Sequence, residues 1–482
     1  LPIITVTSSQ YFGRVGHLFP QVTDRRDPMK DIVVKSVQIP VSRCQEDEWS
    51  NNVKINDVLL ECTRRGGGPV HINIETTFSK VFDVKELPNV RVIRRITAKD
   101  FFPKINAVRV AIFIGSHQRF DKNLIDAIDS FCEKYNAIVI CDHTSNYKGK
   151  YRVLGGIVER QIGYSPTCRN IDLLIHIGEI SGAYYKFNVK SVWRVNPDGE
   201  VRDTFRKLHY VFEMNEYSFF EYYNGLEHEG NNTFYQEWKE EEKNLYGALG
   251  NLPFSNAWIA QQTADKIPAR SVIHFGILHS LRMWNLFEID KSVEGYSNVG
   301  GFGIDGSIST LIGASLCDPQ KLYFLVLGDL ATFYDLNSLG NHHIENNLRI
   351  LVINNGTGFE MRHRTNRGDV FKEDADIIFA AGGHFGNKSR EILKNYSMNL
   401  GFEYFSAESK EEYLKLLPRF TCSKILDKPI LFEVFVDIND EYEAFEKTQY
   451  IFQDSTSKAK NALRGIIGEK GVQILKSIHR DK

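Results

Sequence analysis

Short runs of consecutive apolar residues recur along the chain, and segments with helical spacing of apolar positions separate them. Clear examples are Val110–Gly115, Leu322–Leu327, Arg349–Ile353 and Ile430–Val436. Because these runs are continuous rather than alternating, they predict strands that are buried on both faces of a sheet. Strands that alternate with helices form parallel sheets. The pattern therefore predicts an α/β protein with more than one doubly wound parallel sheet.

Two polar stretches, at 75–88 and 224–236, interrupt this pattern. A chain of 482 residues is also long enough for about three domains at roughly 150 residues each. After Val436 the sequence is charged and mostly helical in its spacing. We expect three α/β units, the second from about Val90 to Tyr223 and the third from Trp238 to about Val436, followed by a helical tail at 437–482.

Composition narrows the class of protein. The net charge of -2 gives no strong field for binding nucleic acid, and no apolar run approaches the roughly 20 residues of a membrane helix. The seven cysteines are odd in number and form no C-x-x-C pair, which argues against a disulfide framework or zinc ribbon and fits a reducing compartment. We therefore expect a cytoplasmic protein with no membrane and no nucleic-acid partner.

The richest chemistry lies where two neighbouring strands are predicted to end. Asp329 follows the run Leu322–Leu327, and Asn354-Asn355-Gly356-Thr357-Gly358 follows the next run, after a predicted helix at 331–341. Ligands of open α/β sheets bind at the carboxyl ends of the strands. A carboxylate, an amide oxygen and a backbone carbonyl suit Mg²⁺ bound together with a diphosphate. The alternative is that Asp329 only caps a helix and the asparagines only form a turn.

The spacing of this motif resembles a known family. Gly-Asp followed after about 25 residues by Asn-Asn is similar to the signature of thiamine diphosphate (ThDP) enzymes, and GDLATFYDLNSL with VINNGTG resembles the menaquinone-pathway synthases (MenD). A second block, Tyr296–Gly306 followed by Ser309-Thr310, is similar to another segment of that family. The resemblance implies a ThDP- and Mg²⁺-dependent transferase or lyase that decarboxylates a 2-oxo acid and joins the product to an acceptor carbonyl or enoyl compound.

The resemblance also gives the three units names. Residues 226–450 would be the diphosphate-binding domain, 90–225 the central domain, and 1–85 a remnant of the pyrimidine-binding domain, with a helical C-terminal tail at 451–482. The segments LPIITVTSS and GGGPVHINIE resemble the middle and the end of the pyrimidine-binding domain. The first of these segments has the pattern of a buried strand and stands at the start of the chain. We therefore expect the first part of this domain to be missing, and with it the family's catalytic glutamate. The family's active sites are shared between subunits, which implies a homodimer or homotetramer.

The resemblance implies roles for particular residues. Asp329, the side chain of Asn355 and the carbonyl of Thr357 would bind Mg²⁺. The residues implied to contact the cofactor are His279, Ser280, Gly301, Phe302, Ile304, Asp305, Gly328, Asp329, Leu330, Asn355, Thr357 and Gly358.

The substrate side departs from the family. Two arginines that hold its dicarboxylate substrates fall on Gln10 and Val299, and a third is displaced to Arg282. Glu360 stands where the family has apolar substrate contacts, so it is either an acid/base group or a solvated surface residue. Gln21 resembles a glutamine that faces the site from the partner subunit. The candidate catalytic residues are therefore Gln21, His279, Arg282 and Glu360, with a substrate different from that of MenD.

Other interpretations stay open. The chain could be a catalytically inactive ThDP-binding homologue or a scaffold subunit. Gly301-x-Gly303-x-x-Gly306 matches the dinucleotide fingerprint, but Asp290 precedes it instead of following it by about 20 residues. The basic run at 362–364, followed by Arg367, is either a solvated loop or a contact for an anionic substrate.

Overall fold

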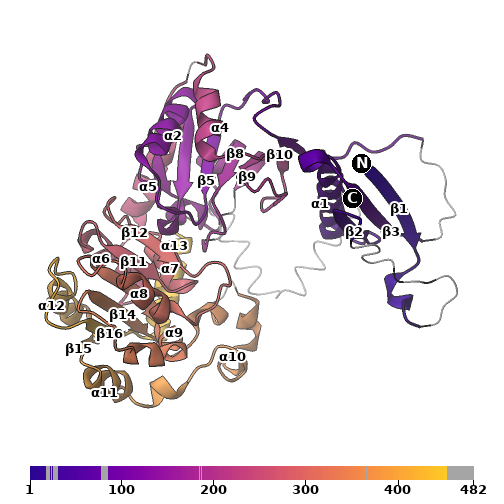
Figure 1. Ribbon diagram of the computed structural model, residues 1–482. Coiled ribbons are helices and arrows are strands. Elements are labelled where there is room, and N and C mark those ends of the chain that lie inside the picture. Colours follow the sequence, from indigo (N-terminus) through magenta and orange to yellow (C-terminus); the bar gives the residue numbers. More distant parts are fainter. Residues whose placement is uncertain are drawn as a thin grey trace. The chain divides into compact units, whose positions relative to one another are not determined.

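The computed structural model describes residues 1–17, 22, 24, 31–77, 85–183, 185, 187–228, 230–363 and 366–452, and only the backbone of 385 and 387. It contains three sheets, of three, seven and six strands, connected largely through helices (Figure 1). The predicted α/β class with parallel sheets is confirmed. Gln21, Arg364 and the tail from 453 lie outside the described residues, and the predicted domain boundaries remain predictions.

The strands follow the apolar runs of the sequence. Their bounds are β1 Ile3–Ser9, β2 Lys35–Ile39, β3 Pro69–Glu75, β4 Arg94–Ile96, β5 Val110–Ile114, β6 Ala137–Cys141, β7 Arg152–Leu154, β8 Asn170–Ile177, β9 Asn188–Val195, β10 Leu208–Phe212, β11 Val272–Phe275, β12 Glu294–Ser297, β13 Tyr323–Gly328, β14 Leu348–Asn354, β15 Glu403–Ala407 and β16 Ile430–Phe435. The sheet orders are β1-β3-β2, β4-β10-β9-β8-β5-β6-β7 and β12-β11-β13-β14-β16-β15.

Helices connect most of these strands. Their bounds are α1 Gln45–Thr63, α2 Lys122–Tyr135, α3 Gly156–Glu159, α4 Glu216–Asn224, α5 Thr233–Ala248, α6 Asn256–Thr263, α7 His279–Trp284, α8 Ser307–Ser315, α9 Asp329–Tyr334, α10 Asp374–Ile378, α11 Glu391–Asn399, α12 Lys410–Phe420 and α13 Ile438–Gln449. The chain forms two compact units. One comprises Leu1–Val110, Asp172–Ile177 and Val189–Leu226, and the other comprises Ala111–Ile171, Gly178–Asn188 and Glu227–Lys482.

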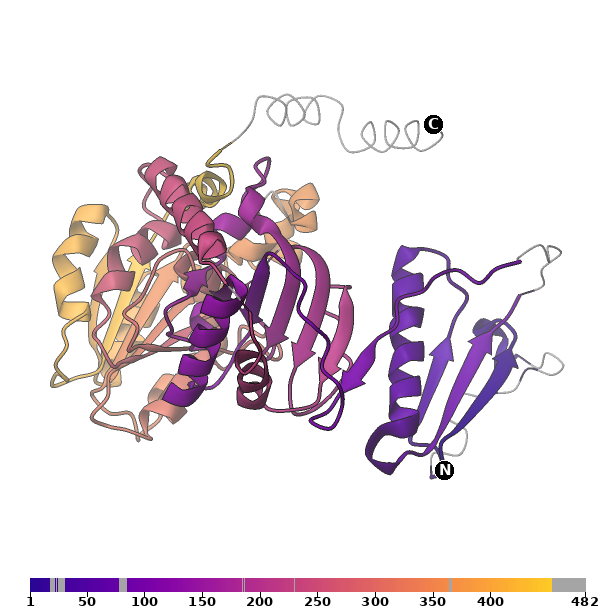
Figure 2. The ribbon, with the colours of Figure 1, turned by 90° about the horizontal axis from the view of Figure 1, so that it is seen from above.

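In the first unit, helix α1 packs on one face of the three-stranded sheet (Figure 2). Val58 and Cys62 of the helix meet Val37, Val70 and Ile72 of β2 and β3 in a small core. Strand β1 is at the edge of the sheet, and its first residues were expected to be buried. That expectation is wrong: Ile3 and Ile4 are each 50% exposed, because the core under α1 is built on the other two strands.

In the second unit, both faces of the six-stranded sheet are covered. One face packs against α8, α9 and α11 through a cluster that includes Ile308, Leu325 and Val352. On the other face Phe324 packs edge-on against Phe420 of α12, with ring centroids 5.5 Å apart. Burial on both faces explains why the strands read as continuous apolar runs rather than alternating ones.

The helix after β13 differs from its prediction. It begins at Asp329 and ends at Tyr334, before a short 3-10 turn at Leu336–Gly340, instead of running over 331–341. Asp335 breaks it, because its carboxylate accepts hydrogen bonds from the backbone N–H of Ser309 at 2.7 Å and from the hydroxyl of Ser338. Side chains that bond locally in this way compete with helix continuation.

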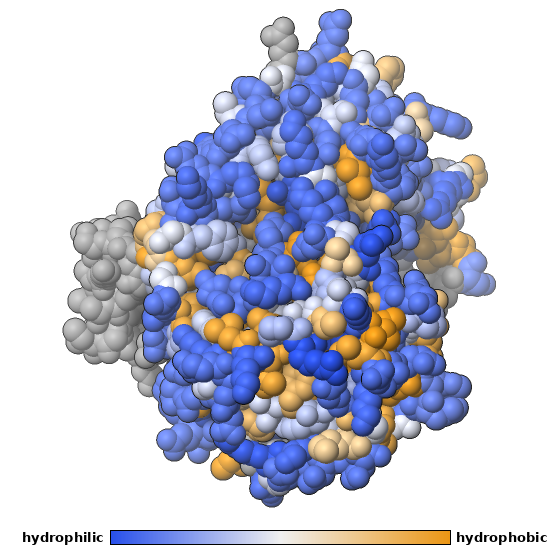
Figure 3. Space-filling view, turned by 90° about the vertical axis from the view of Figure 1, so that its left-hand side faces the viewer, coloured by the Kyte–Doolittle hydropathy of each residue, from blue (hydrophilic) through white to orange (hydrophobic). Residues whose placement is uncertain are grey.

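Within the described residues, no helix is both long and apolar enough to cross a membrane. On the face shown in Figure 3, hydrophilic side chains cover most of the surface and hydrophobic ones gather in separate patches.

Two buried histidines of the second unit predict sensitivity to acid. The Nε2 of His143 lies 3.0 Å from the carbonyl oxygens of both Trp284 and Phe287. Burial, reinforced by the charge of Arg152, lowers the pKa of His143 to about 3, and burial lowers the pKa of His274 to about 4. The unfolded chain binds these protons near pH 6.5, whereas the native state does not. Native stability should therefore fall below that pH, by about 1.4 kcal/mol per pH unit for each histidine.

Denaturant unfolding at pH 7.5, 6.0 and 5.0 measures this slope. His143→Gln should make the slope shallower, whereas substitution of the exposed His342 by Gln should leave it unchanged. A stability that does not change between pH 7.5 and 5.0 would contradict the assignment of neutral buried imidazoles.

Candidate active site

Four segments predicted to contact the cofactor follow four adjacent parallel strands. In the order β12-β11-β13-β14, every neighbouring pair is parallel. The segment Gly301–Asp305 follows β12, His279 and Ser280 follow β11, Asp329 follows β13, and Asn355 follows β14. Parallel strands end at the same edge of a sheet, and that edge is where ligands of α/β proteins bind. The fold thus gathers segments as far apart in sequence as His279 and Asn355, which are 76 positions apart.

Asp329 and the Asn355 turn are neighbours at this edge. Gly328 pairs with Ile353 in the register of β13 and β14, so Asp329 and Asn354-Asn355 follow at neighbouring positions of the two strands. Asp329 is 1% exposed and begins α9, with Gly328 as the N-cap residue. Asp329 is therefore a buried carboxylate at the start of a helix and does not serve as its N-cap.

The two asparagines have different partners. Asn354 donates from Nδ2 to Oε1 of the buried Glu433 at 2.8 Å, and Tyr404 donates to the other oxygen of Glu433 at 2.8 Å. Burial raises the pKa of Glu433, and its two hydrogen bonds act in the opposite direction. Asn355 instead accepts a hydrogen bond within its own turn, from the N–H of Thr357 at 3.2 Å. Asn354 therefore anchors the strand, and Asn355 is the asparagine available to a ligand.

The turn after Asn355 is held from the opposite side by Ala380. The carbonyl of Ala380 accepts from the N–H of Gly358 at 2.6 Å and from the hydroxyl of Thr357 at 3.0 Å. A Cβ on Gly358 would lie 2.9 Å from that oxygen and 3.5 Å from Leu330, so only glycine fits here. The backbone of Gly356 has φ 77, the left-handed conformation that glycine adopts without strain.

His384 is a neighbour of Asp329 that sequence reasoning missed. Its Nε2 lies 2.5 Å from Oδ2 of Asp329, and its ring packs near Phe333 with centroids 5.4 Å apart. Ala381, three residues earlier, has φ 52, which is unusual for a residue other than glycine. The segment 380–384 thus contacts both halves of the candidate metal site. A lone histidine 55 residues after Asp329 gives no pattern by which sequence alone could have placed it.

His279 sits in a second buried network. Its Nε2 lies 3.0 Å from Oε2 of Glu441, and its ring centroid lies 3.9 Å from that of Phe359. The other oxygen of Glu441 accepts the backbone N–H of Asn256 at 2.9 Å, and Asn256 donates to Oγ of Ser280 at 3.3 Å. Glu441 is fully buried. Neither Glu441 nor Asn256 stands in a recognisable motif, so both were missed.

Two polar atoms of this network have no hydrogen-bond partner among the described residues. They are Nδ1 of His279 and Oδ1 of Asn256, and both are buried. Leaving buried polar atoms unpaired costs about 1–3 kcal/mol each. Leu278, just before the helix, has φ 71. Unpaired atoms and an unusual backbone conformation at the sheet edge are features of ligand-binding positions.

The segment after β12 supplies a turn. Phe302 has φ 52 and Gly306 has φ 76, and α8 begins immediately after it. Ile304 packs against the core of the six-stranded sheet, while no atom lies within 4 Å of the position that a Cβ on Gly301 would occupy. Because β11 lies between β12 and β13, this turn is two strands from Asp329.

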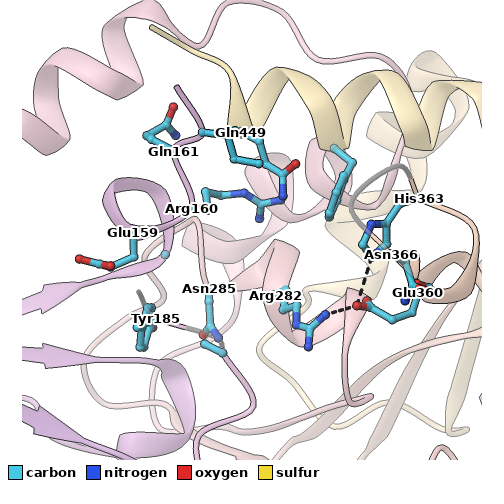
Figure 4. A pocket seen from close by; sticks show the side chains of 14 residues that line it. Glu159, Arg160, Gln161, Tyr185, Arg282, Asn285, Glu360, His363, Asn366 and Gln449 are labelled. Carbon is cyan, nitrogen blue, oxygen red and sulfur yellow. Dashed lines mark hydrogen bonds and ion pairs between the residues drawn. The ribbon is translucent and has the colours of Figure 1, made fainter. Parts of the chain in front are cut away.

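Arg282 and Glu360 meet at a cavity of about 350 Å³ (Figure 4). Arg282 donates from Nη1 to Oε1 of Glu360, and Nε2 of His363 lies 3.2 Å from the same oxygen. Burial acts to raise the pKa of Glu360, but His363 and the charge of Arg282 hold it below its ordinary value. The Glu360 side chain is 17% exposed. The interpretation of Glu360 as a solvated surface residue is therefore wrong.

The donor set at the sheet edge fits Mg²⁺. Asp329 offers a carboxylate, Asn355 an amide oxygen and Thr357 a main-chain carbonyl, all oxygen donors of the kind Mg²⁺ prefers. No group of three or more His, Cys, Asp or Glu side chains within the described ranges could hold a metal. A metal at this edge must therefore use amide and carbonyl oxygens, as this set does.

The fold and this edge define an α/β protein with a set of oxygen donors at the carboxyl ends of its parallel strands. Comparison with known proteins is consistent with that class. The chain is 28% identical over 468 residues to the 2-succinyl-5-enolpyruvyl-6-hydroxy-3-cyclohexene-1-carboxylate synthase of Bacteroides thetaiotaomicron, covering 92% of this chain and 80% of the relative. The synthase of the same name from Bacteroides fragilis is 27% identical over 471 residues, with 91% and 80% covered.

A shorter match has a higher identity. The Christiangramia forsetii synthase of that name is 36% identical over 195 residues, which are 40% of this chain and 32% of the relative. No family model matches the chain. The chain is thus similar to MenD-type synthases, at 27–28% identity over 91–92% of its length.

Proposed function

We propose that the protein is a Mg²⁺- and ThDP-dependent enzyme that decarboxylates a 2-oxo acid and transfers the remaining group to an acceptor carbonyl or enoyl compound. The observation that carries the proposal is the convergence of Asp329, the Asn355 turn and the His279 segment at one edge of the sheet. Likeness to MenD-type synthases supports the reaction class. The departures at Gln10, Val299 and Glu360 favour a substrate different from theirs.

In this proposal the residues of the chain have separate tasks. Asp329, Asn355 and the carbonyl of Thr357 would hold Mg²⁺, and through it the diphosphate. The predicted set from Gly301 to Asp305 would face the pyrimidine, with Gly328, Leu330 and Gly358 shaping the cofactor site. Bound ThDP would supply the carbanion chemistry that amino acid side chains lack.

His279 and Ser280 would be polar contacts for the diphosphate or the substrate. His279 is fixed on both sides, by Glu441 and by the ring of Phe359. Because the ring is already fixed, its Nδ1 points in one direction, and binding of a ligand there would cost little side-chain entropy. Glu360 is held by Arg282 and His363 and is a candidate to move a proton at the substrate. We extend the proposal to a cytoplasmic homodimer or homotetramer with shared sites.

Turnover distinguishes this proposal from a non-catalytic binder. We expect purified protein with ThDP and Mg²⁺ to release CO₂ from at least one member of a panel of 2-oxo acids, and to stop when EDTA is added. Light scattering on the same sample measures the oligomeric state. ThDP binding without CO₂ release from any 2-oxo acid, with or without acceptor aldehydes, would favour the inactive homologue instead.

A further inference from the structure

The cavity beside Glu360 contains a second arginine, Arg160, which forms no ion pair with a carboxylate in the described part of the chain. Arg160 follows α3, and its guanidinium carbon lies 5.0 Å from the ring centroid of Phe445. Among the described residues, no carboxylate lies within 4.0 Å of its nitrogens, and its buried Nε has no hydrogen-bond partner. Burying a charge without a partner is costly, so such an arginine requires a functional explanation.

The charged side chains that line the cavity are Glu159, Arg160, Arg282 and Glu360, with His363 beside them. Arg282 is matched by Glu360. Glu159 also lines the cavity, but its carboxylate points away from Arg160 in Figure 4 and lies 3.6 Å from Arg169. Of the two arginines that line this cavity, Arg160 is therefore the one without an ion pair to a described carboxylate. Burial and the charge of Arg282 lower the pKa of Arg160, and the more distant carboxylate of Glu360 offsets only part of this shift.

Neutral polar groups complete the wall of the cavity. Gln449 is 9% exposed, and its side-chain oxygen has no hydrogen-bond partner in the described chain. Figure 4 shows its amide beside Arg160. Asn285 and Asn366 line the same cavity. An arginine fork flanked by amides is suited to a planar or tetrahedral oxyanion.

We propose that this cavity binds one oxyanion group of the substrate, a carboxylate or a phosphate, through Arg160 with Gln449 beside it. The assignment of the group to the substrate rests on the proposed function; the anion site itself rests only on the cavity. Since one charge is unmatched, the tail of the substrate carries one anionic group here. Recognition by Arg160 also explains how an anionic substrate could be held without the arginines that are missing at Gln10 and Val299.

Calorimetry with the full chain tests the site directly. The probes are butyrate, glutarate and inorganic phosphate, with butyramide as an uncharged analogue, each titrated with and without ThDP and Mg²⁺. We expect one anion per chain to bind and butyramide not to bind. Butyrate stronger than phosphate assigns a carboxylate site, and the reverse order assigns a phosphate site. Arg160→Gln should weaken binding roughly 10- to 100-fold, because a charge-assisted hydrogen bond is lost.

Two variants separate binding from structure. Arg160→Lys should restore part of the affinity, and Arg390→Gln, at an arginine whose side chain is 62% exposed, should change nothing. The midpoint temperature of thermal unfolding of Arg160→Gln should be no lower than that of the wild type, because the variant removes a buried charge that has no ion pair. If Arg160 served only to stabilise the fold, the variant would unfold at a lower temperature than the wild type.

Failure of the anion site and failure of the proposed function give different results. If the wild-type chain bound the anion but not ThDP, the proposed function would be wrong and the anion site would still be supported. Three results would overturn the site: no anion binding by the wild type, equal binding by Arg160→Gln, or glutarate binding more than roughly tenfold tighter than butyrate, which would require two matched charges.

Discussion

Replacing Asp329 by Asn should abolish Mg²⁺-dependent binding of ThDP. The substitution keeps the shape of a buried side chain that is 1% exposed and removes only its charge. Divalent cations are held chiefly by carboxylate charge, so the loss should exceed about 100-fold in affinity for metal and cofactor together. Electron paramagnetic resonance of Mn²⁺, used in place of Mg²⁺ with ThDP present, measures the loss directly.

Asp318→Asn is the matched control for this experiment. Asp318 is an exposed aspartate that accepts the N–H of Gln320 at 3.1 Å in a surface turn of the same unit. It should bind Mn²⁺ and ThDP as the wild type does. Undiminished Mn²⁺ binding by Asp329→Asn would remove Asp329 from the metal site. Circular dichroism of both variants shows whether the fold is retained.

Replacing Glu441 by Ala should produce the largest loss of stability among single changes near the site. It would leave the N–H of Asn256 and the Nε2 of His279 without their acceptor in a fully buried position. Losing one member of such a buried charged network lowers the free energy of unfolding by about 3 kcal/mol. Urea unfolding measures this change, and ThDP affinity should fall as well because His279 loses its orientation.

The neighbouring residue Glu443 supplies the comparison. Its side chain is 55% exposed and pairs with Lys447 on the same helix at 2.7 Å. Glu443→Ala should change the unfolding free energy by no more than about 0.5 kcal/mol. If the two alanine variants were equally stable, Glu441 would not support His279 and the network would be incidental. Glu441→Gln, which keeps an acceptor oxygen, should lie between them.

The strands and the sheet edge could be predicted from sequence because their signals are local. Continuous apolar runs mark strands buried on both faces, and the Leu322–Leu327 run became β13 with one residue of offset at each end. Asp329 and Asn355 were predicted to meet because parallel strands in one sheet end at the same edge. That rule needs only the order of the elements.

Other parts of the site depend on contacts that no local pattern encodes. Glu441 comes from α13, 162 residues after His279, and His384 comes 55 residues after Asp329. The ion pair of Arg282 with Glu360 joins two departures from the family pattern that, in sequence, read as unrelated. Arg160 carried no signal at all, since a single arginine after a glutamate is typical of a protein surface. Strand β1 was misjudged because an apolar run does not show that its strand lies at an edge.

The most direct measurement is a calorimetric titration of ThDP into the full chain, first with Mg²⁺ and then with EDTA. The four strand ends at one sheet edge predict saturable binding with Mg²⁺ and none with EDTA. Binding that is equally strong in both would contradict a metal-bridged diphosphate at Asp329 and Asn355. Failure to bind in Mg²⁺ would contradict ThDP as the cofactor of this chain.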